Sequence, residues 1–310
     1  MKKFIIVLII IIIAGIGTFL YSQGYLDTLL NRETTEETPE DIFPVTGTQE
    51  GNMNASTTAP QNNAPEVVIG ESVGGRDIMA YNFGTGDTRL LFVGGIHGGY
   101  EWNTVLVAYE LMDYLKANPS AIPENVKVTV IPNLNPDGTF KTVGKEGRFT
   151  AANVPSSQTT QVAGRYNAND VDLNRNFDCD WKPTGKWQNK TVNAGSAPFS
   201  EPESAAFRDF VMANRPSAVI AYYSAAGGVY ASNCLGSVSA ETRELTNKYA
   251  AASGYRAYED FDYYELNGDM VNWIAKSNIP GISILLTNHT STEWTKNKAG
   301  VDAILKHFAR

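Results

Sequence analysis

The sequence contains little cysteine, little histidine and no excess of positive charge. Two cysteines among 310 residues exclude a disulfide-dense small fold and a multi-cysteine zinc ribbon. Three histidines, at positions 97, 289 and 307, leave few residues for a histidine-rich metal centre. Lys and Arg total 25 against 33 Asp and Glu, which gives a net charge of −8. Because such a surface repels phosphate backbones, we expect no nucleic-acid partner.

The N-terminal segment is the longest uncharged run. Residues 4–20 follow Lys2 and Lys3, carry no charge, and are just long enough to cross a bilayer core of about 30 Å as a helix. The two lysines favour a cytoplasmic N-terminus, which places the rest outside the cytoplasm. An uncleaved anchor is favoured over a signal peptide because residues 21–24 form a poor cleavage site. We predict a single-pass anchor or signal over residues 1–30, and a secreted chain if it is cleaved.

The rest of the chain divides into a polar segment and a folded domain. Residues 31–65 have few large apolar side chains and predict a disordered linker. Residues 66–310 alternate short apolar runs with amphipathic stretches, which indicates an α/β domain with a largely parallel sheet. The predicted strands cover residues 90–93, 126–131, 218–222 and 282–286, and the predicted helices cover residues 104–115, 205–212, 240–252 and 301–308.

Three polar blocks follow predicted strands or lie in loops, and the second of them is residues 133–138, directly after the strand at 126–131. His97 and Glu101 lie in a glycine-rich turn after the strand at 90–93, where they can converge on one metal ion. The alternative is a simple turn with a glutamate near a helix N-terminus. Two arginines and an asparagine in the loop at 164–177 could hold a carboxylate, or could form ordinary surface ion pairs.

Taken in order and spacing, these blocks resemble a known family. His97 and Glu101, then Asn-Pro-Asp-Gly at 135–138, then Asp-Leu-Asn-Arg-Asn-Phe at 172–177, are similar to the zinc metallocarboxypeptidases of the carboxypeptidase A type. The resemblance covers roughly residues 70–300. It implies one α/β domain with a mixed, mostly parallel twisted sheet of about eight strands flanked by helices. The implied reaction is zinc-assisted hydrolysis of a C-terminal peptide bond.

The resemblance also implies roles for individual residues. His97 and Glu101 match the first two zinc ligands, although three residues separate them here and the family usually has two. Arg165 matches the arginine that stabilises the oxyanion, and Arg148 is the less favoured candidate. The implied substrate-binding set is Arg165, Asn174 and Arg175, the last two for the terminal carboxylate, with Tyr264 as the mobile tyrosine.

Two positions depart from the family pattern. Tyr223 stands where the third zinc ligand, a histidine, belongs, and Leu285 stands where the general-base glutamate belongs. A neutral phenol is a poor replacement for imidazole, and leucine cannot transfer a proton. We therefore expect a weakened zinc site and no catalytic base at position 285.

Other residues around the expected cleft leave alternatives open. His289 could approach the metal, but packing near Trp294 in a surface loop is favoured. Glu265 and Asp269 are expected to be surface carboxylates. Two further alternatives concern pairs of residues: Cys179 and Cys234 form either one disulfide or two buried thiols, and Met270 and Val271 would give an apolar pocket.

The sequence thus supports two functional hypotheses. In the favoured one, the domain is catalytically impaired and binds peptide C-termini or peptidoglycan stem peptides through a free carboxylate. In the other, it is an active zinc carboxypeptidase with a rearranged metal site.

Overall fold

The computed structural model describes residues 64–310, which include the whole region expected to fold. The predicted anchor over residues 1–30 lies outside the described residues, as does the predicted linker up to residue 63. Within residues 64–310, every helix is too short or too polar to cross a membrane.

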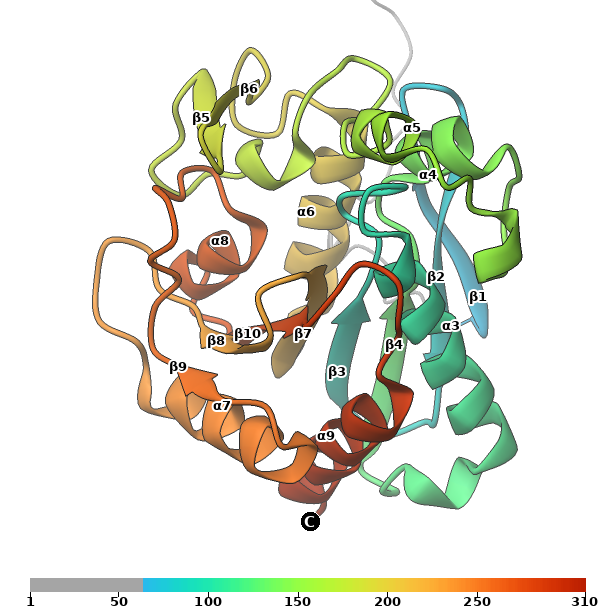
Figure 1. Ribbon diagram of the computed structural model, residues 1–310. Coiled ribbons are helices and arrows are strands. Elements are labelled where there is room, and N and C mark those ends of the chain that lie inside the picture. The colour runs from blue at the N-terminus through green and yellow to red at the C-terminus, as the bar shows by residue number, and fades with distance from the viewer. Residues whose placement is uncertain (1–63) are drawn as a thin grey trace, which may run out of the picture. The chain divides into compact units, whose positions relative to one another are not determined.

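A mixed eight-stranded sheet forms the centre of the domain (Figure 1). Its strand order is β1-β2-β4-β3-β7-β10-β8-β9, and the central strands β4, β3, β7 and β10 run parallel. The strands are β1 (Glu66–Glu71), β2 (Asp77–Phe83), β3 (Thr88–Val93), β4 (Val126–Ile131), β7 (Ala218–Ser224), β8 (Gly228–Ala231), β9 (Ala257–Tyr258) and β10 (Gly281–Leu286). A separate hairpin pairs β5 (Thr184–Trp187) with β6 (Lys190–Asn193).

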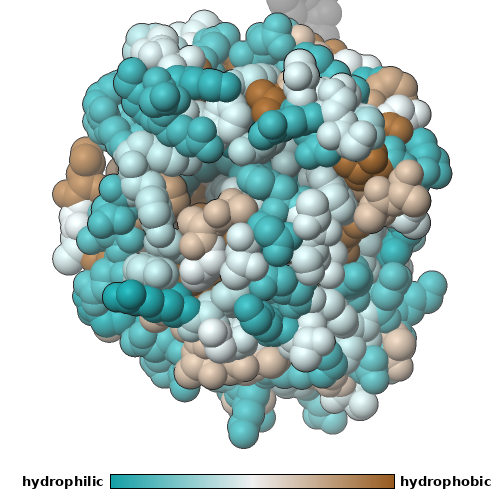
Figure 2. Space-filling view, in the orientation of Figure 1, coloured by the Kyte–Doolittle hydropathy of each residue, from teal (hydrophilic) through white to brown (hydrophobic). Residues whose placement is uncertain are grey.

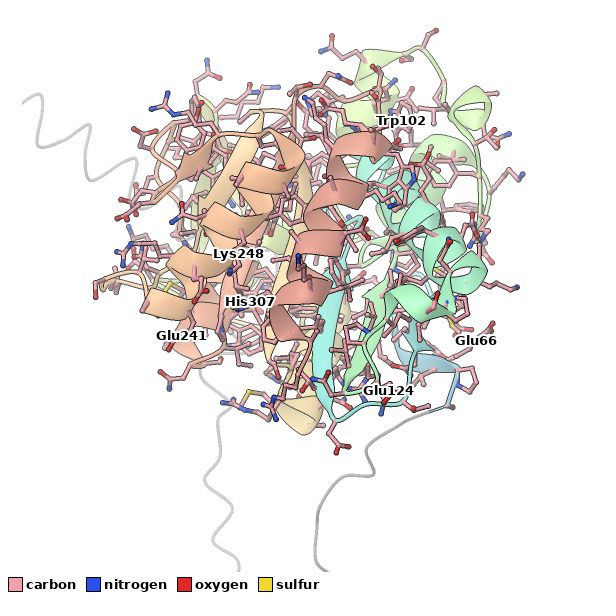
Figure 3. The ribbon with its side chains drawn as sticks, turned by 90° about the horizontal axis from the view of Figure 1, so that it is seen from below. Glu66, Trp102, Glu124, Glu241, Lys248 and His307 are labelled. Atoms are coloured by element: carbon pink, nitrogen blue, oxygen red, sulfur yellow. A yellow bond between two sulfur atoms is a disulfide. The ribbon has the colours of Figure 1, made fainter. Side chains whose placement is uncertain are left out.

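Helices cover both faces of the sheet. Figure 3 shows α7 (Ala240–Ser253), α9 (Trp294–Phe308) and α3 (Trp102–Ala117) side by side along one face. The opposite face is covered by α6 (Pro202–Asn214) and α8 (Met270–Lys276). The loops contain α4 (Pro136–Val143), α5 (Gln158–Ala163) and the 3₁₀ turns η1 (Pro119–Ala121), η2 (Ala151–Asn153) and η3 (Leu173–Arg175). The face of the molecule drawn in Figure 2 is mostly hydrophilic, which agrees with an apolar interior.

Strand alternation divides the interior into two apolar clusters. Tyr222 belongs to the cluster under α3, α7 and α9, whereas Tyr223 belongs to the cluster under α6 and α8. Leu285 lies in the same cluster as Tyr223. Because successive side chains of a strand point to opposite faces, the register decides which residues reach the site at the strand ends.

The structure confirms the predicted fold class. Each of the four predicted strands lies within an observed strand, and β4 has the predicted bounds. The last helix, α9, begins at Trp294, seven residues before the predicted start. The sequence interpretation missed the strands at both sheet edges and the hairpin, because their apolar runs are short and interrupted by polar residues.

The two cysteines form a disulfide, which confirms one of the two alternatives. Cys179 and Cys234 are bonded, with Cα atoms 5.8 Å apart. The bond ties the loop after η3 to the loop after β8.

Candidate functional site

A glycine-rich turn between β3 and α3 positions the first two predicted site residues. Gly98 has a φ of +41°, and a Cβ there would lie 2.7 Å from the carbonyl oxygen of Gly164. Only glycine fits this close approach without strain. The turn places His97 just after the carboxyl end of β3 and Glu101 at the N-cap position of α3, and both side chains are buried.

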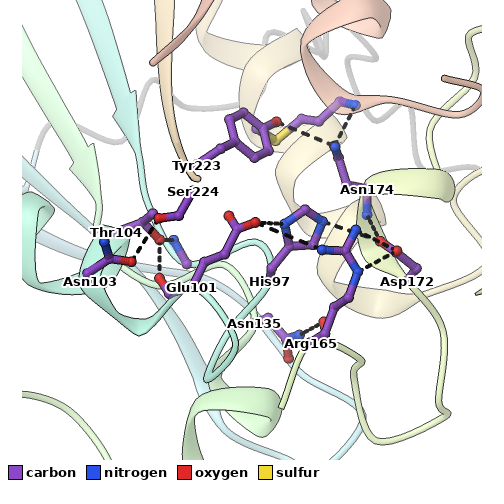
Figure 4. A network of polar contacts seen from close by, with 12 residues as sticks. His97, Glu101, Asn103, Thr104, Asn135, Arg165, Asp172, Asn174, Tyr223 and Ser224 are labelled. Carbon is purple, nitrogen blue, oxygen red and sulfur yellow. Dashed lines mark hydrogen bonds and ion pairs between the residues drawn. The ribbon is translucent and has the colours of Figure 1, made fainter. Parts of the chain in front are cut away.

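His97 lies between two carboxylates (Figure 4). Its Nδ1 is 2.9 Å from Glu101 Oε1, and its Nε2 is 3.4 Å from Asp172 Oδ1. Asp172 also accepts from Arg165, whose Nε and Nη2 are 2.9 and 2.8 Å from Oδ2. Burial opposes the ionisation of Asp172, but Arg165 and His97 outweigh it and hold the pKa of this carboxyl well below its usual value. The buried network is therefore an ionised carboxylate that orients an imidazole and a guanidinium.

Tyr223 and Leu285 lie side by side near the carboxyl ends of β7 and β10, next to this network. They are direct partners in the parallel register of β7 and β10. The ring centroid of Tyr223 is 5.9 Å from that of His97, and its hydroxyl donates to Asn174 Oδ1 at 3.4 Å. Burial raises the pKa of Tyr223 well above its usual value, so the phenol stays neutral. The structure therefore places together, beside the predicted metal ligands, the two residues expected to depart from the family pattern.

The residues present do not complete a zinc site. His97 and Glu101 are suitable donors, and Asp172 is placed as the outer carboxylate that commonly orients a metal-bound histidine. A catalytic zinc site requires a third protein ligand, and position 223 offers only a neutral phenol. In the part of the chain that the structure describes, no three His, Cys, Asp or Glu side chains are arranged to hold a metal ion.

The predicted carboxylate clamp is bonded to the protein itself. Asn174 Nδ2 donates to Asp269 Oδ2 at 2.8 Å. Arg175 is fully buried and donates through Nε and Nη2 to the carbonyl oxygen of Lys186, at 3.1 and 2.7 Å. Binding of a ligand carboxylate by these two residues remains a prediction, and it would require the exchange of these bonds.

Two cavities meet beside this network, and Tyr264 lies between them. The first, here called the inner cavity, has a volume of about 280 Å³. The second, the outer cavity, has a volume of about 460 Å³. Residues that line the inner cavity include Glu101, Tyr223, Asp260, Tyr264, Asp269 and Leu285. Residues that line the outer cavity include Glu101, Arg165, Trp187, Tyr264, Leu285 and His289.

Arg165 is the predicted substrate-binding guanidinium that reaches a cavity wall. Its Cζ lies 4.5 Å from the ring centroid of Trp187, a cation–π distance. The competing candidate, Arg148, lies on the surface, where its guanidinium forms a two-bonded pair with Asp113. The structure thus places Arg165 on a cavity wall and Arg148 in a surface ion pair, and ligand contact by Arg165 remains a prediction.

His289 does not pack against Trp294 as expected. Its ring lies 4.5 Å from that of Tyr100 on the outer cavity, whereas Trp294 contacts Tyr114. The loop after β10 turns back over the strand ends, which a linear reading of the sequence could not show. Burial lowers the pKa of His289, and its Nδ1 has no hydrogen-bond partner among the described residues.

The expected apolar pocket is also not found. Met270 and Val271 are buried in the core, and the inner cavity is lined by their neighbours Asp269 and Asn272. Helix α8 causes this difference, because consecutive residues of a helix point in different directions. Glu265 is exposed, as expected, and pairs with Lys182. Asp269, also expected at the surface, is instead buried as the N-cap of α8.

Sequence reasoning missed the role of Asp172. It lies in the Asp-Leu-Asn-Arg-Asn block, two residues before Asn174, and its side chain caps η3 by accepting from the Asn174 N–H. The available signal is a carboxylate two residues before the first of the two predicted clamp residues.

Comparisons with known proteins agree with this geometry. The sequence profile of the family described as zinc carboxypeptidase matches residues 53–304. Among curated proteins, the chain is 34% identical to bacteriocin BCN5 of Clostridium perfringens over 153 residues, which are 48% of this chain and 15% of that protein. It is 30% identical to human carboxypeptidase Z over 122 residues, which are 35% of this chain and 17% of that protein. The matches therefore span less than a fifth of the length of these relatives.

Solved structures share the fold at low identity. Bovine thrombin-activatable fibrinolysis inhibitor superposes with a TM-score of 0.64 at 18% identity, covering 78% of this chain and 89% of that one. Murein-tripeptide amidase MpaA from Escherichia coli O157 superposes with a TM-score of 0.55 at 20% identity, covering 79% and 92%.

Proposed function

The chain belongs to the zinc carboxypeptidase family, and we propose that it is a member with impaired catalysis that binds peptides by a free C-terminal carboxylate. The observation that carries this proposal is the pairing of Tyr223 with Leu285 beside His97 and Glu101. Both positions line the cleft, and neither side chain can perform the chemistry that hydrolysis requires there.

The two replacements remove different parts of the reaction. A buried neutral phenol is a poor zinc ligand, so metal affinity falls. Leucine can neither take a proton from water nor give one to a leaving amine, and general acid–base catalysis typically contributes about 10²- to 10⁴-fold in rate. The combined loss leaves a cleft that binds peptides but hydrolyses them slowly or not at all.

Arg165 is the group that we assign to the ligand carboxylate. It is the guanidinium on the wall of the outer cavity, and guanidinium recognises carboxylates through paired donors. Asn174 and Arg175 would join it only if their bonds to Asp269 and Lys186 are exchanged.

We further propose that the domain is anchored to a membrane by residues 1–30 and lies outside the cytoplasm, where cell-wall stem peptides are candidate ligands. The uncharged run at residues 4–20 supports the anchor. The fold shared with a murein-tripeptide amidase supports a cell-wall peptide as the ligand class.

Metal content and peptidase activity of the purified full-length chain test the proposal. After dialysis, we expect well under one zinc per chain and no release of C-terminal residues from peptides. About one zinc per chain, with release that a chelator abolishes, would overturn it in favour of an active enzyme with a rearranged site. That alternative is favoured by the presence of His97, Glu101 and Asp172 in one network.

Reversion provides the matched comparison. Tyr223→His combined with Leu285→Glu restores both missing groups, and we expect the double variant to retain more zinc than the wild type. Each single variant serves as a control, because Leu285→Glu alone adds a carboxylate without the missing ligand. Peptide binding is measured in parallel, with a free C-terminal acid against its amide. Equal affinity for both would contradict carboxylate recognition.

A further inference from the structure

Arg175, the second residue of the predicted clamp, is a buried cation without a bonded anion. Its exposure is 0%, and all three of its hydrogen bonds end on backbone carbonyl oxygens, one on that of Asn174 and two on that of Lys186. Within residues 64–310, no carboxylate forms an ion pair with Arg175. Because arginine is almost never fully buried unless it is paired, this guanidinium is suited to an anion that a ligand supplies.

The β5–β6 hairpin covers the guanidinium. Nε and Nη2 of Arg175 donate to the same carbonyl oxygen of Lys186, at 3.1 and 2.7 Å. These two nitrogens form one edge of the guanidinium, and a carboxylate binds to such an edge through two parallel hydrogen bonds. A neutral oxygen of the protein therefore occupies the edge to which a ligand carboxylate would bind.

The backbone of β5 lies directly against the Arg175 side chain. A Cβ on Gly185 would lie 2.5 Å from Arg175 Cδ, so glycine permits this close approach. Trp187 and Gln188, which follow Lys186, line the outer cavity, whereas Arg175 lines neither cavity. The end of β5 and the turn after it thus contact Arg175 on one side and the outer cavity on the other.

The hairpin is held in place by few tertiary contacts. It is a separate two-stranded sheet of four residues per strand, and Figure 1 shows it apart from the eight-stranded sheet. An isolated hairpin is marginally stable, so its closed position depends on its contacts with the domain. These include the bonds from Arg175 to Lys186, the Trp187 ring 4.5 Å from Arg165 Cζ, and the buried side chain of Val192. Two of these three contacts use an arginine of the predicted ligand-binding set.

We propose that the Lys186 carbonyl is an internal competitor for Arg175, and that a ligand carboxylate displaces it together with the β5–β6 hairpin. A carboxylate offers two oxygens and a full negative charge, whereas the carbonyl offers one neutral oxygen. A neutral carboxamide has no such advantage, so it leaves the hairpin closed. The hairpin is then an element that determines specificity, because acids reach Arg175 and neutral C-termini do not. This inference rests on the proposed function, since it concerns the same ligand carboxylate.

Displacement of the hairpin lowers the affinity for the acid. The apparent dissociation constant equals the intrinsic one divided by the fraction of molecules in which Arg175 is uncovered. A change that loosens the hairpin raises that fraction. It should therefore tighten the binding of an acid and leave the binding of a carboxamide unchanged.

Hydrogen exchange of the full-length chain tests the displacement. The probe is N-acetyl-trialanine as the free acid, and its C-terminal carboxamide is the matched control; both are added to protein dialysed to remove metal. With saturating acid, the backbone N–H groups of residues 184–193 should exchange about threefold faster or more, and the carboxamide should leave them unchanged. Helix α6 is the internal reference and should not change. Unchanged or slower exchange of the hairpin in the acid complex would overturn the proposal.

Two variants test the competition by affinity. Val192→Ala removes a buried anchor of β6 and should tighten binding of the acid about three- to tenfold through the larger uncovered fraction. Thr184→Ala is the matched control, since it makes a similar β-branched-to-alanine change on an exposed residue of β5, and should change neither affinity. Calorimetric titration of both probes provides the affinities. Equal or weaker acid binding by a folded Val192→Ala variant would contradict an internal competitor, and the exchange experiment on the wild type depends on neither variant.

The outcome is distinguishable from that of the proposed function. Equal affinity for acid and carboxamide would contradict carboxylate recognition, and this inference with it. Tighter binding of the acid with an unchanged hairpin would retain carboxylate recognition through Arg165 and reject the displacement alone.

Discussion

Removal of the Cys179–Cys234 disulfide should destabilise the domain by several kilocalories per mole. The bond joins positions 55 residues apart in the sequence. In the chain-entropy treatment, a loop of that length corresponds to about 4 kcal/mol of stabilisation through the restricted unfolded chain. For a domain of this size, that loss lowers the melting temperature by roughly 8–16 °C, at about 2–4 °C per kcal/mol.

The double variant Cys179→Ala with Cys234→Ala makes this change without leaving a reactive thiol. Its free energy of unfolding is measured by urea denaturation beside that of the wild type. Cys179 is 5% exposed and packs in the apolar cluster under α6 and α8, so the variant also loses the contacts of its sulfur atom. Wild-type protein reduced with dithiothreitol keeps that sulfur and separates the two effects.

Two outcomes would refute a stabilising effect of the cross-link on the unfolded chain. If the double variant and the reduced wild type each lose less than about 1 kcal/mol, the unfolded chain is not restricted by this bond as assumed. If only the double variant is destabilised, the sulfur contact rather than the cross-link stabilises the domain. The cross-link also fixes the Asn233 edge of the inner cavity, so its loss should weaken ligand binding.

Two further predictions concern buried carboxylates. Asp172→Asn leaves the fully buried Arg165 without its partner and should lower the free energy of unfolding by about 3–5 kcal/mol. The control is Asp302→Asn, which breaks the exposed pair with Lys298. It should change the free energy of unfolding by about 1 kcal/mol or less. Burial raises the pKa of Glu203, so the folded state holds this proton more tightly than the unfolded chain does. The contribution of Glu203 to stability is then complete below the unfolded pKa of about 4.3 and decreases as the pH rises through the folded pKa. Glu203→Gln should remove that part of the slope in denaturation curves collected between pH 4 and neutrality, and an unchanged slope would contradict the assignment.

The sequence alone predicts the parallel strands at the centre of the sheet and the part of the site that lies at their carboxyl ends. Short, largely apolar runs identify β3, β4, β7 and β10, since strands covered on both faces of a sheet are rich in apolar residues. The glycine-rich turn and the polar blocks then indicate which strand ends carry the chemistry. The placement of Tyr223 beside Leu285 follows from the same logic, because both end central strands of one parallel sheet.

Other features of the site depend on tertiary contacts that spacing does not encode. Arg175 is itself a predicted ligand-binding residue, but the hairpin at β5 supplies a carbonyl that binds its guanidinium. His289 lies in a polar loop whose return path is set by hydrogen bonds from Asn103 to the carbonyls of Asn288 and Ser291. Such interactions join residues more than ten positions apart, so no local pattern in the chain predicts them.

Under the proposed function, Tyr223 and Leu285 also explain how the fold would lose its catalytic groups without losing its stability. A functional site holds charged side chains where burial is unfavourable, which is a common reason why active sites reduce stability. Leu285 and Tyr223 instead join the apolar cluster that contains Leu91 and Val93, and the phenol keeps its one polar atom near Asn174. Burial of a leucine and a neutral phenol carries no ionic desolvation penalty. Restoring Glu at 285 reintroduces that penalty, so the reverted double variant has to be judged by its free energy of unfolding as well as by its zinc. A variant that folds less stably but retains zinc would show that this corner of the sheet exchanged metal binding for stability.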